Sequence, residues 1–583
     1  MKLRTPIVAL LVCSAIALPA ASDPVRGMVV HEWGTFLAMH GSDGITLDGM
    51  YHEEHALPPF VHARGRDQLR LRTSNMKGET PVIYFYTDRP ARVRVDVGFP
   101  AGLWTQWYPQ AEMVGPGLAQ TGSPPQLRKG RISWNVDVVP PAGAPVRLPE
   151  TSRDALWNHA RDVDAAYVTA ADTARPGAPR EWERFIFYRG LGEGALPLDV
   201  KASNGRITAR TDDGDGVRHV FILRVEHGRG VYEYVPSLER GIALERAVPS
   251  MADALPLEQF VETVAGAVAV RLVESGLYEK EARAMINTWR SSYFRSDGIR
   301  ILFVLPQSWT DRHIPMRIEP RPASLVRVMV GRVELLTAER ERRMESAIRD
   351  LASPDLATRE RAFTALRAEG RYVEPIIRRT LRTSADERVR TLCRRLLLTD
   401  FVTELRTALT DAETGEKTHS DPVFVRAQLA SLLREIGLAE EAVQEGRTAL
   451  AKLERMPGPT MSDHASRNLY RALARANEGA GNDAAALRWY GDFVRFGSQM
   501  CDGCHTTEGP RDASFFRDWY AGRKFGEYAV RTGEAPRLIA AHEATLAETP
   551  SRMASQLVLA YLYEARGDLS KARAMWERIS PAR

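Results

Sequence analysis

Two cysteines and a histidine near the C-terminus are the residues of this chain whose types and spacing best suit chemistry. The stretch "SQMCDGCHTTEGP", residues 498–510, holds Cys501 and Cys504 three positions apart, with His505 directly after them. Two thiols at this spacing can bond to one flat macrocycle, oxidise to a disulfide, or ligate a metal together with the imidazole. Coincidence is the remaining interpretation. The choice decides whether the chain does redox chemistry or only holds other molecules.

The motif resembles the C-x-x-C-H attachment signature of c-type haem proteins. The resemblance implies that Cys501 and Cys504 each add to one vinyl group of the porphyrin, with His505 as the iron ligand beneath it. The segment "CDGCHTTEGP" is also similar to the cytochrome c pattern, in which glycine and proline follow the histidine by four and five residues. It implies one covalent haem c per chain, bound by these three residues, with His505 as the metal ligand.

Other interpretations of the motif stay open. In an oxidising compartment, Cys501 and Cys504 could form a disulfide, and His505 would then lower the pKa of the thiol. Zinc is less well supported, because the sequence has no second C-x-x-C. A sixth haem ligand is not identified by the sequence. Methionine there would raise the potential and a second histidine would lower it. The candidates are Met553, His542 and His464.

The N-terminus predicts export. Residues 1–22 resemble a Sec-type secretory signal, with Lys2 and Arg4 before an apolar run, and with small residues for cleavage near Ala20–Ser22. We therefore expect a periplasmic or extracellular protein without a membrane span. Of the four cysteines, three would remain after cleavage, too few for a disulfide framework. The formal charge of +5 falls to +3 with the loss of Lys2 and Arg4, a balance that favours neither nucleic acid nor an anionic membrane as a partner.

Residues 23–335 are predicted to form a β-rich, sandwich-like α+β region. "TPVIYFYT" and "ARVRVDVGF" read as a hairpin-like pair of strands, and "SNGR" and "DDGDG" read as turns between later strands. Residues 256–294 carry apolar positions at helical spacing, which predicts a helical insert, and "GIRILFVLP" then returns to strand. Several short strands of this kind are typical of packed sheets.

This half is also similar to a group of exported bacterial proteins of unknown function. The similar segments are "HEWGTF", "ETPVIYFY", "RFIFYRG", "GLYEKEARAMINTW" and "VRVMVGRVE". The resemblance covers residues 28 to about 335. It implies no activity, so it assigns no catalytic residue to this chain.

Residues 336–400 resemble a HEAT-type helical repeat. "SPDLATRERA", then "EP" and "ADERVR", separate three predicted helices. Each helix would have one apolar face. The faces are formed by Ala362, Phe363 and Leu366, by Ile376, Ile377 and Leu381, and by Val389, Leu392 and Leu396.

Residues 401–583 resemble tetratricopeptide repeats. Gly437, Gly481, Gly533 and Gly567 are expected between paired helices, and the last interval is the 34-residue period of that family. Small residues would let the helices approach closely, namely Ala430, Ala474 and Ala560 before the glycine and Ala442, Ala486 and Ala572 after it. The longer Gly481–Gly533 interval predicts an extended haem-attachment loop at residues 497–513. A small cytochrome c domain starting near Gly491 and Phe493 is the alternative, but the repeat at residues 557–579 claims much of its length.

Other candidate sites are less specific. Five histidines near the N-terminus, with Glu32, Glu53 or Glu54, could form a metal site, although separately hydrogen-bonded histidines are the simpler interpretation. Asp212–Gly216 is expected to be a hairpin turn rather than a calcium loop, and Cys393 a buried thiol. An arginine group could dock an acidic partner but is expected to be a solvated helix face. The histidines are His31, His40, His52, His55 and His62, and the arginines are Arg378, Arg379, Arg388, Arg390, Arg394 and Arg395.

Taken together, the sequence predicts a multidomain chain, with a β-rich region followed by an all-α helical-repeat solenoid that carries a haem-attachment loop. We expect an exported monohaem c-type protein that transfers electrons, or a redox subunit docked to a protein partner through its repeats. The redox partner and the oligomeric state are not identified by the sequence. The alternative is a non-haem tetratricopeptide/HEAT binding scaffold with a Cys501–Cys504 disulfide. On either reading we expect a carrier or scaffold rather than an enzyme.

Overall fold

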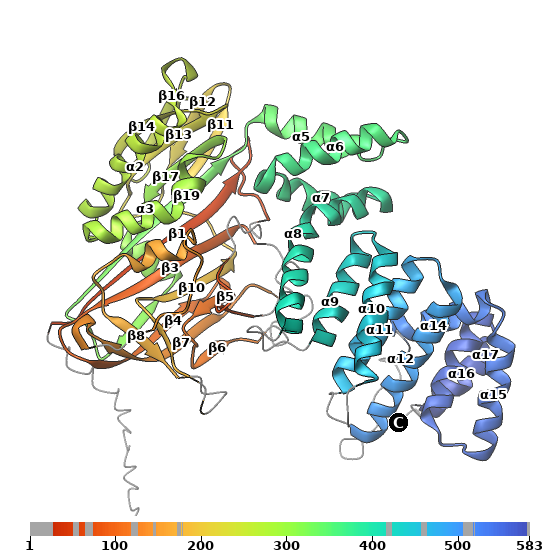
Figure 1. Ribbon diagram of the computed structural model, residues 1–583. Coiled ribbons are helices and arrows are strands. Elements are labelled where there is room, and N and C mark those ends of the chain that lie inside the picture. Colours follow the sequence, from red (N-terminus) through yellow and green to blue (C-terminus); the bar gives the residue numbers. More distant parts are fainter. Residues whose placement is uncertain are drawn as a thin grey trace, which may run out of the picture. The chain divides into compact units, whose positions relative to one another are not determined.

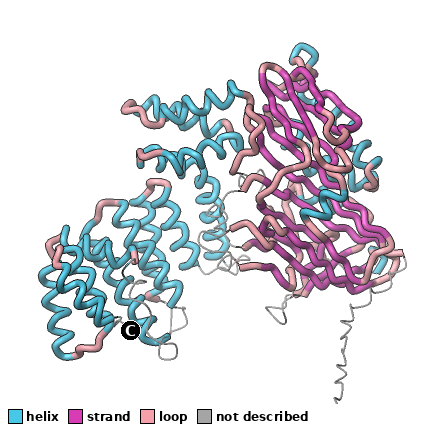
Figure 2. Tube along the Cα trace, turned by 180° about the vertical axis from the view of Figure 1, so that it is seen from behind, coloured by secondary structure: helices cyan, strands magenta, loops and turns pink. Residues whose placement is uncertain are grey.

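The computed structural model describes residues 27–49, 57–64, 74–117, 126–143, 147–171, 177, 179–414, 422–455, 463–504, 517 and 519–579. The chain divides into two compact units. The first comprises Met1–Glu345 and Gly370–Pro375, and the second comprises Ser346–Glu369 and Ile376–Arg583. Strands dominate the first unit and helices the second (Figures 1 and 2). The predicted β-rich region followed by an all-helical region is therefore confirmed, whereas the predicted signal at residues 1–22 lies outside the described residues.

The largest sheet of the first unit has ten strands in the order β16-β14-β13-β17-β19-β1-β3-β10-β5-β2. Its central pair, β1 and β19, is parallel, and the other pairs are antiparallel. The strands are β1 (Val29–His40), β2 (His62–Ala63), β3 (Met76–Tyr86), β5 (Gly102–Tyr108), β10 (Ile186–Gly192), β13 (Val217–Glu226), β14 (Arg229–Leu238), β16 (Leu255–Pro256), β17 (Gly298–Val304) and β19 (Ser324–Leu335).

Two smaller sheets complete the β structure. One follows the order β18-β4-β7-β8-β9, with β6 also paired to β7, and the other is β11-β12-β15. Their strands are β4 (Ala91–Phe99), β6 (Met113–Gly115), β7 (Gly130–Val139), β8 (Tyr167–Ala170), β9 (Glu181–Glu183), β11 (Asp199–Ser203), β12 (Arg206–Arg210), β15 (Ala243–Ala247) and β18 (Met316–Glu319).

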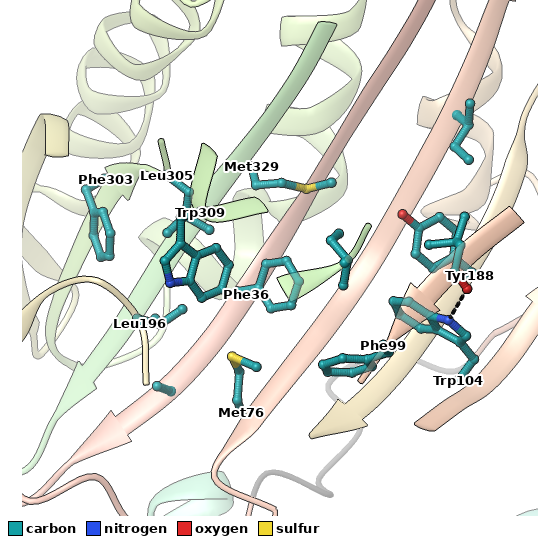
Figure 3. Packing of buried hydrophobic residues seen from close by; sticks show 14 of the residues in the cluster. Phe36, Met76, Phe99, Trp104, Tyr188, Leu196, Phe303, Leu305, Trp309 and Met329 are labelled. Atoms are coloured by element: carbon teal, nitrogen blue, oxygen red, sulfur yellow. Dashed lines mark hydrogen bonds between the residues drawn. The ribbon is translucent and has the colours of Figure 1, made fainter. Parts of the chain in front are cut away.

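The first unit is built in layers around the ten-stranded sheet. One face of that sheet packs on the two smaller sheets, through a core that includes Phe36, Trp104, Trp134 and Ile207. Figure 3 shows Phe36 of this core among Met76, Trp309 and Met329. The other face is covered by helices, including α1 (Trp157–Arg161), α2 (Leu257–Glu274) and α3 (Glu279–Phe294), in a second core (Figure 1). A short helix, α4 (Gln307–His313), precedes β18. Sheet-on-sheet packing and the helical insert of the sequence prediction are both present.

The hairpin predicted at "SNGR" is present, whereas the other predicted hairpin connections are wrong. β11 and β12 form a hairpin through Asn204 and Gly205, whose φ values of 51° and 71° suit the tight "SNGR" turn. The predicted pair of β3 and β4 is wrong, because β3 pairs with β1 and β10, whereas β4 pairs with β7 and β18 in another sheet. Asp212–Gly216 is likewise no hairpin turn, since it connects β12 to β13 of a different sheet.

Helices α5 to α8 follow the β-rich region. They are α5 (Ala338–Asp350), α6 (Leu356–Ala368), α7 (Glu374–Thr383) and α8 (Glu387–Thr414). Of the faces predicted for them, Ala362, Leu366, Ile376, Ile377 and Val389 are buried, while Phe363, Leu381, Leu392 and Leu396 are half-buried. Helix α8 continues through residue 400, so the predicted boundary there falls inside a helix. The boundary expected at residue 335 lies ten residues before the end of the main segment of the first unit.

The rest of the second unit consists of helices arranged in consecutive pairs. They are α9 (Pro422–Glu435), α10 (Ala439–Leu453), α11 (Asp463–Gly479), α12 (Asp483–Cys504), α14 (Tyr520–Arg531), α15 (Ala535–Glu548), α16 (Met553–Arg566) and α17 (Leu569–Ile579). Among the described residues, no helix combines the length and the apolar character that a membrane crossing requires.

The connections within these pairs agree with the predicted glycines. Gly437, Gly481, Gly533 and Gly567 have φ between 72° and 81°, the left-handed conformation that commonly ends a helix. The six predicted small residues are at most 2% exposed, so adjacent helices pack closely at those positions. They are Ala430, Ala442, Ala474, Ala486, Ala560 and Ala572. Tyr490 and Trp576, which follow the second alanine in their pairs, are also buried.

Candidate functional sites

The cysteines of the C-x-x-C-H motif belong to the C-terminal end of α12. That helix runs from Asp483 to Cys504, so residues 497–504 are helical where the sequence predicted the start of a loop. The difference has a local cause, because Phe496, Gln499 and Met500 tolerate a helix, and the first strong breakers after the motif are Gly509 and Pro510. His505 and the rest of the predicted loop, through residue 513, lie outside the described residues.

The preceding turns of α12 are firmly packed in the helical unit. Tyr490 and Val494 are fully buried, and the Tyr490 hydroxyl donates a hydrogen bond to Glu478 of α11 at 2.5 Å. The ring of Phe493 lies 5.3 Å from that of Trp519, just before α14. Gly491 allows α14 to approach, since a Cβ there would lie 3.1 Å from the Phe525 ring. Contacts on both sides therefore fix the direction of the helix that leads into the motif.

The three candidates for a sixth haem ligand have different surroundings. His542 of α15 is half-buried, and its Nδ1 is 3.1 Å from Ser555 Oγ of α16. Met553, the first residue of α16, is half-buried and packs against the apolar core of the helical unit. His464 lies in the first turn of α11. The identity of a sixth ligand stays a prediction with three candidates.

The histidines near the N-terminus have separate partners. His31 Nδ1 contacts Glu281 at 2.8 Å, and His62 Nε2 contacts Glu181 at 2.9 Å. His40 Nδ1 donates to the Val200 carbonyl at 3.0 Å, and burial lowers the pKa of His40. His52, His55, Glu53 and Glu54 lie outside the described residues. Within the described part of the chain, no group of three or more histidine, cysteine or acidic side chains could hold a metal ion.

His31 belongs to a buried polar cluster that the sequence did not indicate. The carboxylate of Glu281 is fully buried, and it accepts hydrogen bonds from the Tyr86 hydroxyl at 2.8 Å and from the Tyr278 backbone at 2.7 Å. The carboxylate and burial together raise the pKa of Tyr86, with burial the larger cause. Glu281 is 250 residues from His31, so no local spacing could have paired them.

Two further clusters bury charge within the large sheet. Arg327 of β19 donates to Glu32 of β1 at 2.6 Å, and Tyr188 of β10 also donates to Glu32. Near the other end of β19, Glu334 accepts hydrogen bonds from Arg300 and Arg332, all three side chains being fully buried. The sequence did hold a signal for these buried ion pairs, namely the charged residues within the predicted strands "GIRILFV" and "VRVMVGRVEL". A charge inside an otherwise apolar strand must be paired when it is buried.

The remaining predicted residues have ordinary structural surroundings. Asp213, in the acidic turn, pairs with Arg312 at 2.6 Å, and Arg390 and Arg394 pair with Glu387 of their own helix. Cys393 is fully buried as predicted, and burial raises the pKa of its thiol to about 11. Such a thiol is protonated at neutral pH and is a poor nucleophile.

Comparison of the chain with protein-family models and with curated proteins gives no match.

Proposed function

We propose that the chain is an exported c-type haem protein, with one haem held by Cys501, Cys504 and His505. The observation that carries the proposal is the run Cys-Asp-Gly-Cys-His itself, in a chain with one other cysteine outside the predicted signal. Each thiol would add across one vinyl C=C bond of the porphyrin, with sulfur bonding to one carbon and hydrogen to the other, so attachment would need no oxidant. The His505 imidazole would then be the protein ligand to iron.

The position of the motif at the end of α12 supports this assignment. Helix α12 continues to Cys504, so the backbone of both motif cysteines belongs to one helix. The packed turns around Tyr490 and Val494 would hold the attachment point in a fixed direction. When bound, the haem would supply a one-electron Fe(III)/Fe(II) couple.

The helical pairs would supply the docking surface for a redox partner. We infer that they are tetratricopeptide-like repeats of a solenoid, preceded by a HEAT-like segment. Left-handed glycines at regular places and buried small residues at the helix contacts support the inference. Electron transfer to a docked protein is then the function that best combines the motif with the repeats.

Maturation in a bacterial host that exports the protein and attaches c-type haem tests the proposal. We expect a Soret band, a haem-stained band on a denaturing gel, and a mass increased by one haem. Cys501→Ala and Cys504→Ala should each weaken covalent attachment, and the double variant should abolish it. Cys393→Ala is the matched control, because Cys393 lies in a different helix and should leave the haem band unchanged.

The same experiment separates the scaffold alternative. The scaffold alternative predicts a colourless wild-type chain that is lighter than the reduced chain by two hydrogen atoms. It also predicts that the Cys501→Ala/Cys504→Ala variant still captures the protein partner. Both results together would establish a disulfide-linked binding protein. His505→Ala adds a further criterion, since loss of the axial ligand should alter the Soret spectrum even where thioether attachment survives.

A further inference from the structure

A cavity of about 530 Å³ lies on the helix-covered side of the large sheet. Its walls come from β3, β10, α1 and α3, and residues from the segments 57–59 and 150–156 complete the lining. The volume lies within the range of about 300–1,000 Å³ that is typical of small-molecule sites. The described residues of the lining include no histidine and no cysteine, so the cavity is distinct from the candidate sites considered above.

Three deeply buried side chains of the lining form an aromatic floor. They are Trp157, Phe185 and Phe187, each at most 6% exposed. The Trp157 ring lies 5.0 Å from each phenylalanine ring, and its indole donates to Glu183 at 2.8 Å. Because contacts within the protein already fix these side chains, an apolar ligand would find a surface that needs little rearrangement.

Apolar side chains with greater exposure also line the cavity. Leu57, Ala155 and Leu156 are half-buried, so part of their hydrocarbon surface faces water. Removal of apolar surface from water is favourable in proportion to the area covered. A ligand with hydrocarbon surface of its own would therefore be stabilised both by the aromatic floor and by these three side chains.

Three hydroxyl groups of the lining are already engaged within the protein. Thr151 Oγ1 donates to Asn158 Oδ1 at 2.6 Å, and Thr288 Oγ1 donates to a carbonyl of its own helix at 2.8 Å. Thr80 Oγ1 accepts from Arg189 Nη2 at 3.4 Å. These hydroxyl groups consequently do not require polar atoms from a ligand.

The hydrocarbon surface of the lining, rather than its charge, indicates the class of ligand. Arg189 and Glu150 bring charges of opposite sign to the lining. Hydrophobic contact is non-directional and does not depend on the sign of a charge. The ligand can therefore be assigned by its apolar part, whatever polar group it carries.

We propose that this cavity binds a small molecule through an apolar, hydrocarbon part. That part would lie on the aromatic floor and contact Leu57, Ala155 and Leu156. An aromatic and an aliphatic skeleton share this chemistry, and the test below distinguishes them. The inference is independent of haem attachment, because every described residue of the lining belongs to the β-rich unit.

The test is calorimetric titration of the full-length protein with two series of neutral alcohols. The aliphatic series is 1-butanol, 1-hexanol and 1-octanol, and the aromatic series is benzyl alcohol and 2-naphthalenemethanol. Neutral probes are chosen because their binding does not depend on the charge of the lining. We expect saturable binding in at least one series, with an affinity that rises about tenfold for each two added methylene groups, or by at least that factor from the smaller aromatic alcohol to the larger.

A substitution in the lining locates the binding. Ala155→Phe would place a large side chain in the cavity and should abolish binding of 1-octanol and 2-naphthalenemethanol. Ala269→Phe in α2 is the matched control, because Ala269 is also half-buried against the same apolar core but does not line the cavity. This control variant should bind like the wild type.

Three results would overturn the proposal. One is the absence of binding by both 1-octanol and 2-naphthalenemethanol at about 1 mM, a concentration that reveals even weak sites. Another is an affinity that does not rise with hydrocarbon size in either series, a comparison on the wild-type protein that needs no variant to fold. The third is binding that survives Ala155→Phe in a protein with wild-type circular dichroism, since the alcohol would then bind elsewhere.

Discussion

Replacement of Glu334 tests whether buried charge pairs hold the large sheet together. Glu334 is fully buried on β19 and accepts hydrogen bonds from Arg300 Nε at 3.2 Å and from Arg332 Nε at 2.8 Å. Tyr372 donates a third hydrogen bond to it. Glu334→Gln keeps the size of the side chain but removes the carboxylate that both guanidinium groups contact. We expect the free energy of unfolding to fall by about 3–5 kcal/mol, the usual cost of breaking a buried pair.

Glu245→Gln is the matched control. Glu245 also lies on a strand of the β-rich unit and pairs with Arg206 at 3.1 Å, but both side chains are more than half exposed. Water and salt screen that pair, so its loss should cost about 0–1 kcal/mol. Urea unfolding followed by tryptophan fluorescence measures both variants, since Trp104 and Trp134 report on the core of the same unit. Equal shifts of the transition for the two variants would refute the reasoning.

Further predictions concern pH, a thiol and two glycines. Burial opposes the charge of Glu334, but Arg300 and Arg332 lower its pKa overall, so the ionised carboxylate stabilises the fold fully above the unfolded pKa of about 4.3 and this stabilisation is lost as the pH falls through the folded pKa. Below about pH 5, the unfolding free energy should therefore fall less steeply with pH in Glu334→Gln than in the wild type. Parallel pH dependences of the two proteins would contradict this prediction. In a Cys501→Ala/Cys504→Ala variant, a thiol reagent at about pH 8 should modify Cys393 in urea but not in the native protein, because burial raises the pKa of the Cys393 thiol to about 11. Rapid labelling of the native protein would contradict this and show that the helices around Cys393 open. Gly526→Ala should destabilise the helical unit by about 1–3 kcal/mol, because its Cβ would lie 2.5 Å from the Tyr561 carbonyl oxygen. As a control, Gly266→Ala in α2 places a Cβ where nothing lies within 4 Å and should stabilise the β-rich unit by about 0.5–1 kcal/mol. Thermal unfolding that ranks the two variants in the opposite order would contradict the packing at α14.

Local sequence signals predicted the elements of this chain better than their partners. Asn204 and Gly205 identify their hairpin, because few residues other than asparagine and glycine adopt positive φ readily. The glycines predicted between paired helices were located correctly for the same reason, because they also adopt positive φ. "TPVIYFYT" and "ARVRVDVGF" were correctly read as strands, but alternation of apolar residues does not state which sheet a strand joins. That choice depends on the cores on the two faces of the large sheet.

The sites show the same limit. The C-x-x-C-H motif is visible in the sequence because its chemistry depends on residues adjacent in the chain. Thr80, Arg189 and Trp289 line one cavity of the β-rich unit, although they belong to β3, β10 and α3. Because these residues are far apart in the chain, no sequence motif could have predicted that cavity. The continuation of α12 to Cys504 was missed because the repeat spacing located an insertion without showing how much of it extends a helix.

The central position of the parallel pair β1–β19 has a consequence during synthesis. The two strands that meet in the middle of the sheet come from opposite ends of the β-rich unit, and Glu32 and Arg327, which link them, are 295 residues apart. Until β19 leaves the ribosome, one edge of β1 has no neighbour on that side, and an unpaired, apolar strand edge is prone to intermolecular pairing. A nascent chain that stops short of residue 324 should thus require a chaperone, whereas the complete unit can close its own sheet.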